Sequence, residues 1–122
     1  HEVIMSPTSH AYFDYYQSED KDKEPLAIGG FLSLEKVYQF EPIPENIEPE
    51  KIKFILGGQG NVWTEYINTP EKVEYMAIPR MSAMAEVLWS KKSDRNFLSF
   101  KKRMEWQYKR LDAMKVNYRK DS

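Results

Sequence analysis

Short apolar runs and longer amphipathic stretches alternate along the chain. Val3 to Ser6 and Lys53 to Leu56 are short runs in which apolar residues dominate, and Pro7 and Gly57 follow them as residues that interrupt a strand. Both runs are therefore predicted as short strands. Residues 7–25 contain an aromatic stretch and then a polar run without apolar residues, so they are predicted as a loop.

Helical spacing of apolar residues marks the remaining stretches. Thr69, Pro70 and Glu71 offer a capping hydroxyl, a proline at the first helical position and an acid in the first turn. They predict a helix through Ala77 that bends or restarts at Pro79. The predicted apolar faces are Phe31, Leu34, Val37 and Tyr38; Val73, Met76, Ala77, Met81, Met84, Ala85 and Leu88; and Phe97, Phe100, Met104, Tyr108, Leu111 and Met114, the last behind a predicted cap at Ser93-Asp94.

The order of these elements favours parallel strands joined by helical crossovers, and hence an α/β fold. Two strands alone do not make a stable covered sheet. A (β/α)8 barrel takes about 250 residues, so in that architecture the chain holds only the last part of the barrel and a terminal helix. Functional residues in such barrels follow the carboxyl ends of the strands, which here means the segments after Ser6 and after Leu56.

Composition narrows the possible classes of protein. The chain has 122 residues, 18 Lys and Arg against 19 Asp and Glu, a net charge of −1 and an apolar share of 41%, which is material for one domain. Charges of both signs are interspersed, and no apolar run approaches the ~20 residues of a membrane span. Neither nucleic acid nor a membrane span is therefore expected. The chain opens on His1 rather than Met, with an apolar run directly behind it, which predicts a segment of something longer.

Catalytic groups of several kinds are missing from the sequence. There is no Cys and there are only two His, so we expect no metal and no cofactor. His10 is read as a surface or hydrogen-bonding residue. Arg80 is expected to form a structural ion pair, either with Glu86 or with a carboxylate of the barrel.

The segment after the second predicted strand carries the most informative pattern. Three glycines among residues 57–60 precede Trp63 and Glu65, and an i, i+2 spacing places these two side chains on one side of an extended chain. An indole offers a flat surface to the apolar face of a sugar ring, while a carboxylate accepts hydrogen bonds from the hydroxyls, each worth about 1.5–3 kcal/mol. The alternative is that Trp63 belongs to the core and Glu65 is simply solvated.

Tyr12 and Asp14 repeat the same spacing after the first predicted strand. An aromatic loop is by itself most often a packing feature. Two aromatic-x-acid pairs, each placed after a strand, are less easily accidental and together favour a carbohydrate site.

The motifs of the chain resemble the C-terminal part of the β-N-acetylhexosaminidases of glycoside hydrolase family 20. The resemblance covers essentially the whole chain, in order. It rests on Val3-Ile4-Met5-Ser6-Pro7 with Tyr12-Phe13-Asp14, Gly57-Gly58-Gln59 with Trp63-x-Glu65, Pro79-Arg80-Met81-Ser82-Ala83-Met84-Ala85-Glu86 with Leu88-Trp89-Ser90, and Val116-Asn117-Tyr118-Arg119.

The resemblance implies the C-terminal portion of a (β/α)8 TIM barrel, about its last two β/α units, in residues 1–92, with a C-terminal helix in residues 93–122 that packs on the barrel. It also implies an exo-acting enzyme that removes terminal β-linked N-acetylglucosamine or N-acetylgalactosamine by a substrate-assisted retaining mechanism. By similarity, Tyr12 acts in catalysis by binding the acetamido oxygen. Trp63 forms an aromatic wall, and Asp14 and Glu65 bind hydroxyls.

Two departures from the family pattern stand out. The adjacent Asp-Glu pair that supplies the general acid has no counterpart at an earlier strand end, so the segment alone is predicted to be inactive and to need the remainder of the same barrel. Ile28 stands where relatives often have Trp. The resemblance to bacterial enzymes implies a periplasmic or extracellular location.

Two other functions stay open on the sequence. One is a stand-alone carbohydrate-binding module that uses Trp63 and Glu65; the other is a helical interaction domain whose Met and aromatic stripes bind a partner. An unclosed barrel leaves strand edges uncovered, so the isolated segment is expected to self-associate in any case.

Overall fold

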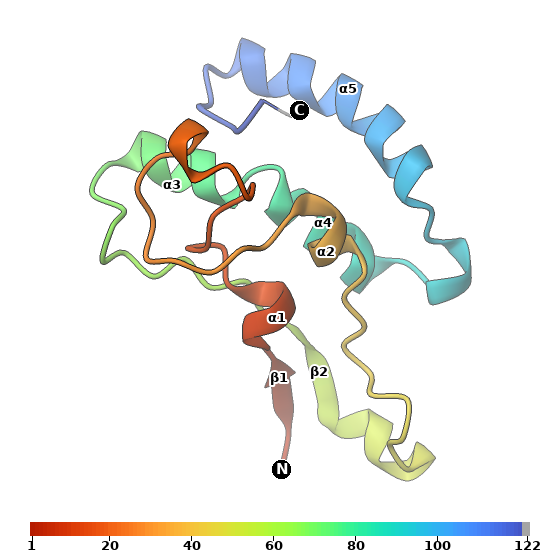
Figure 1. Cartoon of the computed structure of the whole chain (residues 1–122). Coiled ribbons are helices and arrows are strands. Elements are labelled where there is room, and N and C mark those ends of the chain that lie inside the picture. The colour runs from red at the N-terminus through yellow and green to blue at the C-terminus, as the bar shows by residue number, and fades with distance from the viewer. Residues whose placement is uncertain (121–122) are drawn as a thin grey trace.

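A two-stranded parallel sheet lies at one end of the molecule in the computed structural model, which describes residues 1–120 (Figure 1). Strand β1 (Val3–Met5) pairs with β2 (Ile55–Gly58), in the register Val3 to Ile55, Ile4 to Gly57 and Met5 to Gly58. The parallel arrangement predicted from the element order is confirmed.

Strand β2 starts two residues later than predicted. Lys53 and Phe54 close a 3-10 helix, η2 (Pro49–Phe54), and Gly57 and Gly58 extend the strand at its other end. Pro49 occupies the first helical position, which its fixed φ favours, and the turn that it opens runs on into the apolar residues.

A long connection leads from the first strand to the second. It contains α1 (Thr8–Ala11), a short 3-10 helix, η1 (Lys21–Lys23), and α2 (Leu34–Tyr38). The hydroxyl of Ser33 caps α2 by accepting a hydrogen bond from the amide of Lys36. Phe31, predicted on the apolar face of this helix, instead lies before it and pairs with Tyr16 in an isolated bridge.

The second half of the chain is helical. Helices α3 (Pro70–Ala77) and α4 (Arg80–Trp89) follow one another with the predicted break at Pro79, and Thr69 caps α3 as predicted. Helix α5 (Phe97–Ala113) is preceded by a third 3-10 helix, η3 (Lys92–Asp94). The prediction of a cap at Ser93-Asp94 was wrong: the Asn96 side chain accepts from the amide of Ser99, because the intervening turn delays the start of α5.

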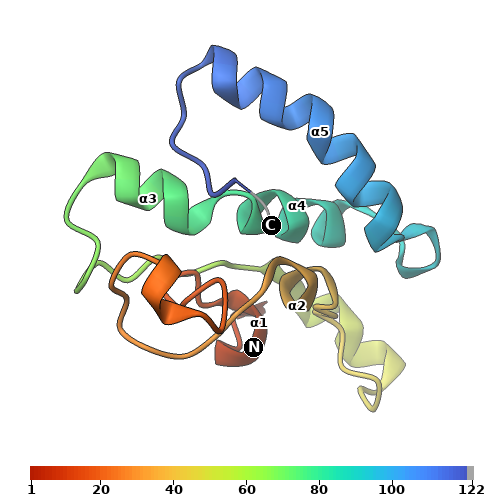
Figure 2. The ribbon, with the colours of Figure 1, turned by 45° about the horizontal axis from the view of Figure 1, so that its top comes forward.

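These helices are stacked in layers. Figure 2 shows α3 and α4 in the middle, with α5 on one side and α1, α2 and the loop between them on the other. The core lies chiefly between α2 and α4 and the inner face of α5. Its buried residues are Ala11, Phe13, Leu32, Val37, Tyr38, Phe40, Ala83, Met84, Val87, Phe100 and Met104. Met114, predicted on the α5 stripe, lies beyond the helix and is exposed.

The chain after α5 folds back onto the rest of the molecule. The amide of Arg119 donates to the carbonyl of Ile78, and its side chain forms an ion pair with Glu24 at 2.9 Å. Tyr75 also donates to Glu24, at 2.8 Å. The Glu24 side chain, only 3% exposed, thus joins the connection between the strands to both α3 and the end of the chain.

No helix within the described residues is long and apolar enough to cross a membrane.

Candidate functional site

Backbone pairing continues beyond the carboxyl ends of the two strands and brings the loops that follow them together. The amide of Gln59 donates to the carbonyl of Met5, the amide of Asn61 to that of Ala11, and the amide of Phe13 to that of Asn61, at 3.0, 2.7 and 2.7 Å. As a result, Tyr12 lies opposite Asn61 in an isolated parallel bridge. This pairing places the residues around Tyr12 beside those that lead to Trp63.

Three polar side chains tie the two strand ends together. The Gln59 amide donates to Asn61, the Asn61 amide donates to Ser6, and the Ser6 hydroxyl donates to the carbonyl of Gln59, at 2.8, 2.7 and 2.9 Å. Sequence reasoning missed this ring of hydrogen bonds. The available signal was a hydroxyl side chain at the end of the first predicted strand, Ser6, and two amide side chains shortly after the second, Gln59 and Asn61.

The paired loops form an open hollow of about 440 Å³. Its lining contains all four predicted site residues, Tyr12, Asp14, Trp63 and Glu65, together with Tyr15 and Ile28. The rings of Tyr12 and Trp63 have their centroids 6.5 Å apart, and those of Tyr12 and Tyr15 are 5.7 Å apart. Trp63 is 51% exposed, so the alternative that it belongs to the core is wrong.

Asp14 is buried, with 6% of the residue exposed, although it lines the hollow. Its Oδ1 oxygen has no hydrogen-bond partner among the described residues. Burial raises the pKa of this carboxyl above its ordinary value. A backbone hydrogen bond lowers the pKa again, the negative charge of Glu65 raises it further, and the positive charge of Arg80 lowers it. A buried oxygen without a partner is an acceptor ready for a hydroxyl donor.

Two glycines allow the aromatic loop to approach its neighbours closely. A Cβ on Gly60 would lie 2.4 Å from the ring of Phe13, and a Cβ on Gly30 would lie 2.5 Å from the ring of Tyr15. Gly30 also has a φ of +63°, which other residues adopt at a cost. The absence of side chains at these positions therefore lets the rings of Phe13 and Tyr15 pack directly against the backbone of Gly60 and Gly30.

The ion pair between Arg80 and Glu86, one of the two alternatives predicted, is wrong. Arg80 is fully buried and donates to backbone carbonyls, whereas Glu86 accepts hydrogen bonds from Arg103 and Tyr38. The reason is geometric: Glu86 points toward α5, and the Arg80 guanidinium points to the loop that carries Tyr12 and Asp14. His10 lies away from the hollow, stacked on Phe40 and in contact with Ser9, so it has the hydrogen-bonding role expected of it.

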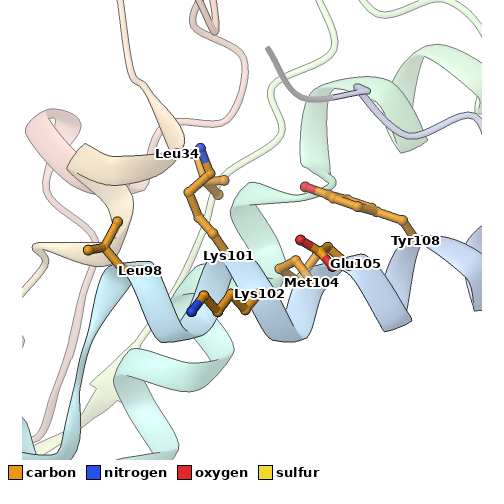
Figure 3. Close-up of a pocket in the computed structure, with 7 residues that line it drawn as sticks. All are labelled: Leu34, Leu98, Lys101, Lys102, Met104, Glu105 and Tyr108. Atoms are coloured by element: carbon orange, nitrogen blue, oxygen red, sulfur yellow. The ribbon is translucent and has the colours of Figure 1, made fainter.

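A second hollow, of about 500 Å³, lies between α5 and the start of α2 (Figure 3). It is lined by Leu34, Leu98, Lys101, Lys102, Met104, Glu105 and Tyr108. None of these residues follows a strand end or pairs an aromatic wall with two acids, so the hollow around Tyr12 is the candidate site. Among residues 1–120, no three His, Cys, Asp or Glu side chains are grouped so that they could hold a metal ion.

The fold and the site define a class of protein: an α/β chain with an open hollow, lined by aromatic and acidic side chains, at the carboxyl ends of two parallel strands. Residues 1–92 match the model of the protein family described as "Glycosyl hydrolase family 20, catalytic domain". The chain belongs to this family. It is 41% identical over 119 residues to a beta-hexosaminidase of Porphyromonas gingivalis, a match that covers 97% of this chain and 15% of that protein. It is 33% identical over 105 residues to a beta-N-acetylhexosaminidase of Cellulomonas fimi, which covers 84% of this chain and 20% of the relative.

Solved structures agree with these matches. The chain superposes on a family 20 exo-beta-N-acetylglucosaminidase from Vibrio harveyi, in complex with N-acetylglucosamine, with a TM-score of 0.82, 35% identity and coverage of 98% of this chain and 19% of that one. For the beta-N-acetylhexosaminidase of Streptomyces coelicolor the TM-score is 0.83, with 25% identity and coverage of 98% and 24%. The chain thus spans about a fifth of the length of these relatives.

Proposed function

We propose that this chain is the last two β/α units and the closing helix of a (β/α)8 barrel that acts as an exo-β-N-acetylhexosaminidase. The observation that carries the proposal is the hollow itself: Tyr12, Asp14, Trp63 and Glu65 come from the ends of two neighbouring parallel strands and face a common space. The names of the relatives support a β-linked N-acetylhexosamine as the substrate class, with N-acetylglucosamine named for one of them. Terminal N-acetylglucosamine and N-acetylgalactosamine are the substrates that the family resemblance implies.

The uncovered surface of the sheet supports a larger barrel. Val3, Ile4 and Leu56 are exposed on the two strands, and Trp89 at the end of α4 is 91% exposed. Apolar side chains on a strand pair that has no further neighbours are expected to be covered by adjoining strands and helices. In the proposed enzyme, the remainder of the barrel covers them and closes the hollow. In the isolated segment, the same surface drives self-association.

The proposed mechanism is the one that the resemblance to the family implies, and the residues that line the hollow could take part in it. The substrate's own acetamido oxygen attacks the anomeric carbon, giving an oxazoline-type intermediate that water opens with retention of configuration. The Tyr12 hydroxyl donates a hydrogen bond to that oxygen and holds it in line for attack. Trp63 packs against the sugar and its acetamide, while the Asp14 and Glu65 carboxylates accept hydrogen bonds from ring hydroxyls.

The general acid comes from elsewhere in the enzyme. No adjacent Asp-Glu pair follows either strand of the described segment, so we place the pair that polarises the acetamide and protonates the leaving oxygen on an earlier strand of the same barrel. The segment alone is therefore inactive. A periplasmic or extracellular location belongs to the same proposal, by likeness to bacterial hexosaminidases.

The experiment compares turnover of an aryl N-acetyl-β-glucosaminide by the full-length protein and by two matched variants. Tyr12→Phe removes only the hydroxyl, and we expect kcat to fall by roughly 10²–10³-fold with little change in KM, as for the loss of one donor to a developing charge. Tyr15→Phe is the control, because Tyr15 lines the same hollow without a proposed role. Near-normal turnover of Tyr12→Phe, or an equal loss in both variants, would contradict the assignment of Tyr12. A full-length protein without this activity would contradict the proposed function.

A further inference from the structure

Arg80, the first residue of α4, contacts the loop that contributes Tyr12, Asp14 and Tyr15 to the hollow. It is fully buried, and its guanidinium lies 5.4 Å from the ring centroid of Phe13. It does not line the hollow and therefore would not touch a bound sugar.

The guanidinium holds the backbone on both sides of Asp14. Nη2 donates to the carbonyl of Phe13 at 2.5 Å, and Nη1 donates to the carbonyl of Tyr15 at 3.0 Å. Its other bonds go to the carbonyls of Leu32 and Met76, which lie before α2 and in α3. The guanidinium thus fixes the carbonyl groups of Phe13 and Tyr15, the residues on either side of Asp14, relative to the helical layer. Its planar, rigid fork of donors suits this role.

The same side chain places a positive charge behind the hollow. The charged and titratable groups that act on it are Asp14, Glu24, Arg119 and Tyr75, and those that act on Asp14 are Glu65 and Arg80. Burial lowers the pKa of Arg80 to about 9, and the charge of Asp14 opposes that shift. The interaction is reciprocal, because the positive charge favours the ionised form of Asp14 against burial and against Glu65.

We propose that Arg80 is a positioning residue of the sugar site, whose fork holds the Tyr12–Tyr15 segment in register with the hollow and whose charge keeps Asp14 available as a hydrogen-bond acceptor. The inference rests on the proposed function, since it assigns Arg80 a role in the same site. The two parts of the role, the fork and the charge, are separable by substitution.

The experiment uses three variants of the full-length protein. Arg80→Lys keeps the charge but loses the planar fork, and Arg80→Gln loses both. Arg95→Lys is the matched control, because Arg95 also donates to backbone carbonyls, those of Ser90 and Phe40, and pairs with Glu41 away from the hollow. Folded fraction is measured by thermal unfolding, and kcat and KM for the aryl glycoside are measured across pH.

The expected result differs for each variant. Arg80→Lys lowers kcat by about 10- to 100-fold, the scale of a displacement of about 1 Å at a reacting group, while the acid limb of the pH profile for kcat/KM stays in place. Arg80→Gln also moves that acid limb to higher pH, because the pKa of Asp14 rises when the positive charge is gone. Arg95→Lys leaves kcat and the pH profile unchanged at equal folded fraction.

Several results would overturn the proposal. One is an equal kcat for Arg80→Lys and Arg95→Lys at equal folded fraction; another is an unmoved acid limb in Arg80→Gln. Failure of both Arg80 variants to fold, while Arg95→Lys folds, would assign Arg80 to the stability of the fold alone. A wild-type protein that does not cleave the aryl glycoside would instead contradict the proposed function, and this result is distinguishable from a failure of the role assigned to Arg80.

Discussion

Substituting Gly60 by alanine tests how the two loops pack, because it adds one methyl group against the ring of Phe13. The added Cβ would lie 2.4, 2.8 and 3.0 Å from three carbon atoms of the Phe13 ring. Carbon atoms normally pack at about 3.5–4.0 Å, so the ring must move by about 1 Å. It has little room to do so, since the Phe13 amide is bonded to Asn61 and the Arg80 guanidinium lies over the ring.

The expected cost is that of overpacking a buried site, about 1–3 kcal/mol in the free energy of unfolding. Denaturant unfolding followed by tryptophan fluorescence measures it. Because Phe13 lies between Tyr12 and Asp14, the proposed function also requires a loss of kcat, on the order of 10²-fold for a 1 Å displacement.

A double-mutant cycle separates this cause from a backbone effect of alanine itself. Phe13→Leu shortens the side chain, so the Gly60→Ala cost should be smaller in that background than in the wild type, with a coupling energy of about 0.5–3 kcal/mol. Additive effects, or a Gly60→Ala protein as stable as the wild type, would refute the argument that Gly60 is required for the close packing of Phe13.

Two further predictions concern the rest of the molecule. Burial and the charge of Lys36 lower the pKa of His10 from its ordinary value of 6.5. The unfolded chain therefore binds a proton at His10 more readily than the folded protein does. The contribution of neutral His10 to the free energy of unfolding is complete above pH 6.5 and decreases as the pH falls below that value. His10→Gln should remove part of this loss when thermal midpoints are compared at neutral and mildly acidic pH, and an unchanged slope would count against it. Asn96→Ala should cost about 1 kcal/mol in unfolding free energy, whereas Ser93→Ala should cost little; equal losses in denaturant titrations would show that the helix begins elsewhere.

Local chemistry made much of the fold predictable. Thr69, Pro70 and Pro79 carry their own conformational preferences, so the start of α3 and the break before α4 follow from them directly. The aromatic-x-acid pairs were recognisable because their spacing and their place after a strand are local features. The gathering of Tyr12, Asp14, Trp63 and Glu65 in one hollow then follows from parallel pairing.

Features that depend on distant parts of the chain were not predictable in the same way. The sequence suggested an ion pair for Arg80 because Glu86 lies near it in sequence. The carbonyl groups that Arg80 actually contacts, those of Phe13, Tyr15 and Leu32, lie 48 to 67 positions away. The inclusion of Ile28 and Tyr15 in the hollow depends on the path of a loop without a periodic pattern. The cap of α5 was misplaced because Ser93, Asp94 and Asn96 all have capping side chains, and only the extra 3-10 turn decides between them.

The buried contact between Glu24 and Arg119 has a consequence for how the protein is made. The two residues are 95 positions apart, and the later one lies almost at the end of the described chain. During synthesis from the N-terminus, the connection that borders the hollow leaves the ribosome long before its cationic partner has been added. During synthesis the carboxylate of Glu24 can therefore meet Tyr75 first, and it gains its ion pair only after Arg119 has been added. The buried ion pair that joins the connection between the strands to the segment after α5 is thus among the last contacts of the described residues to form.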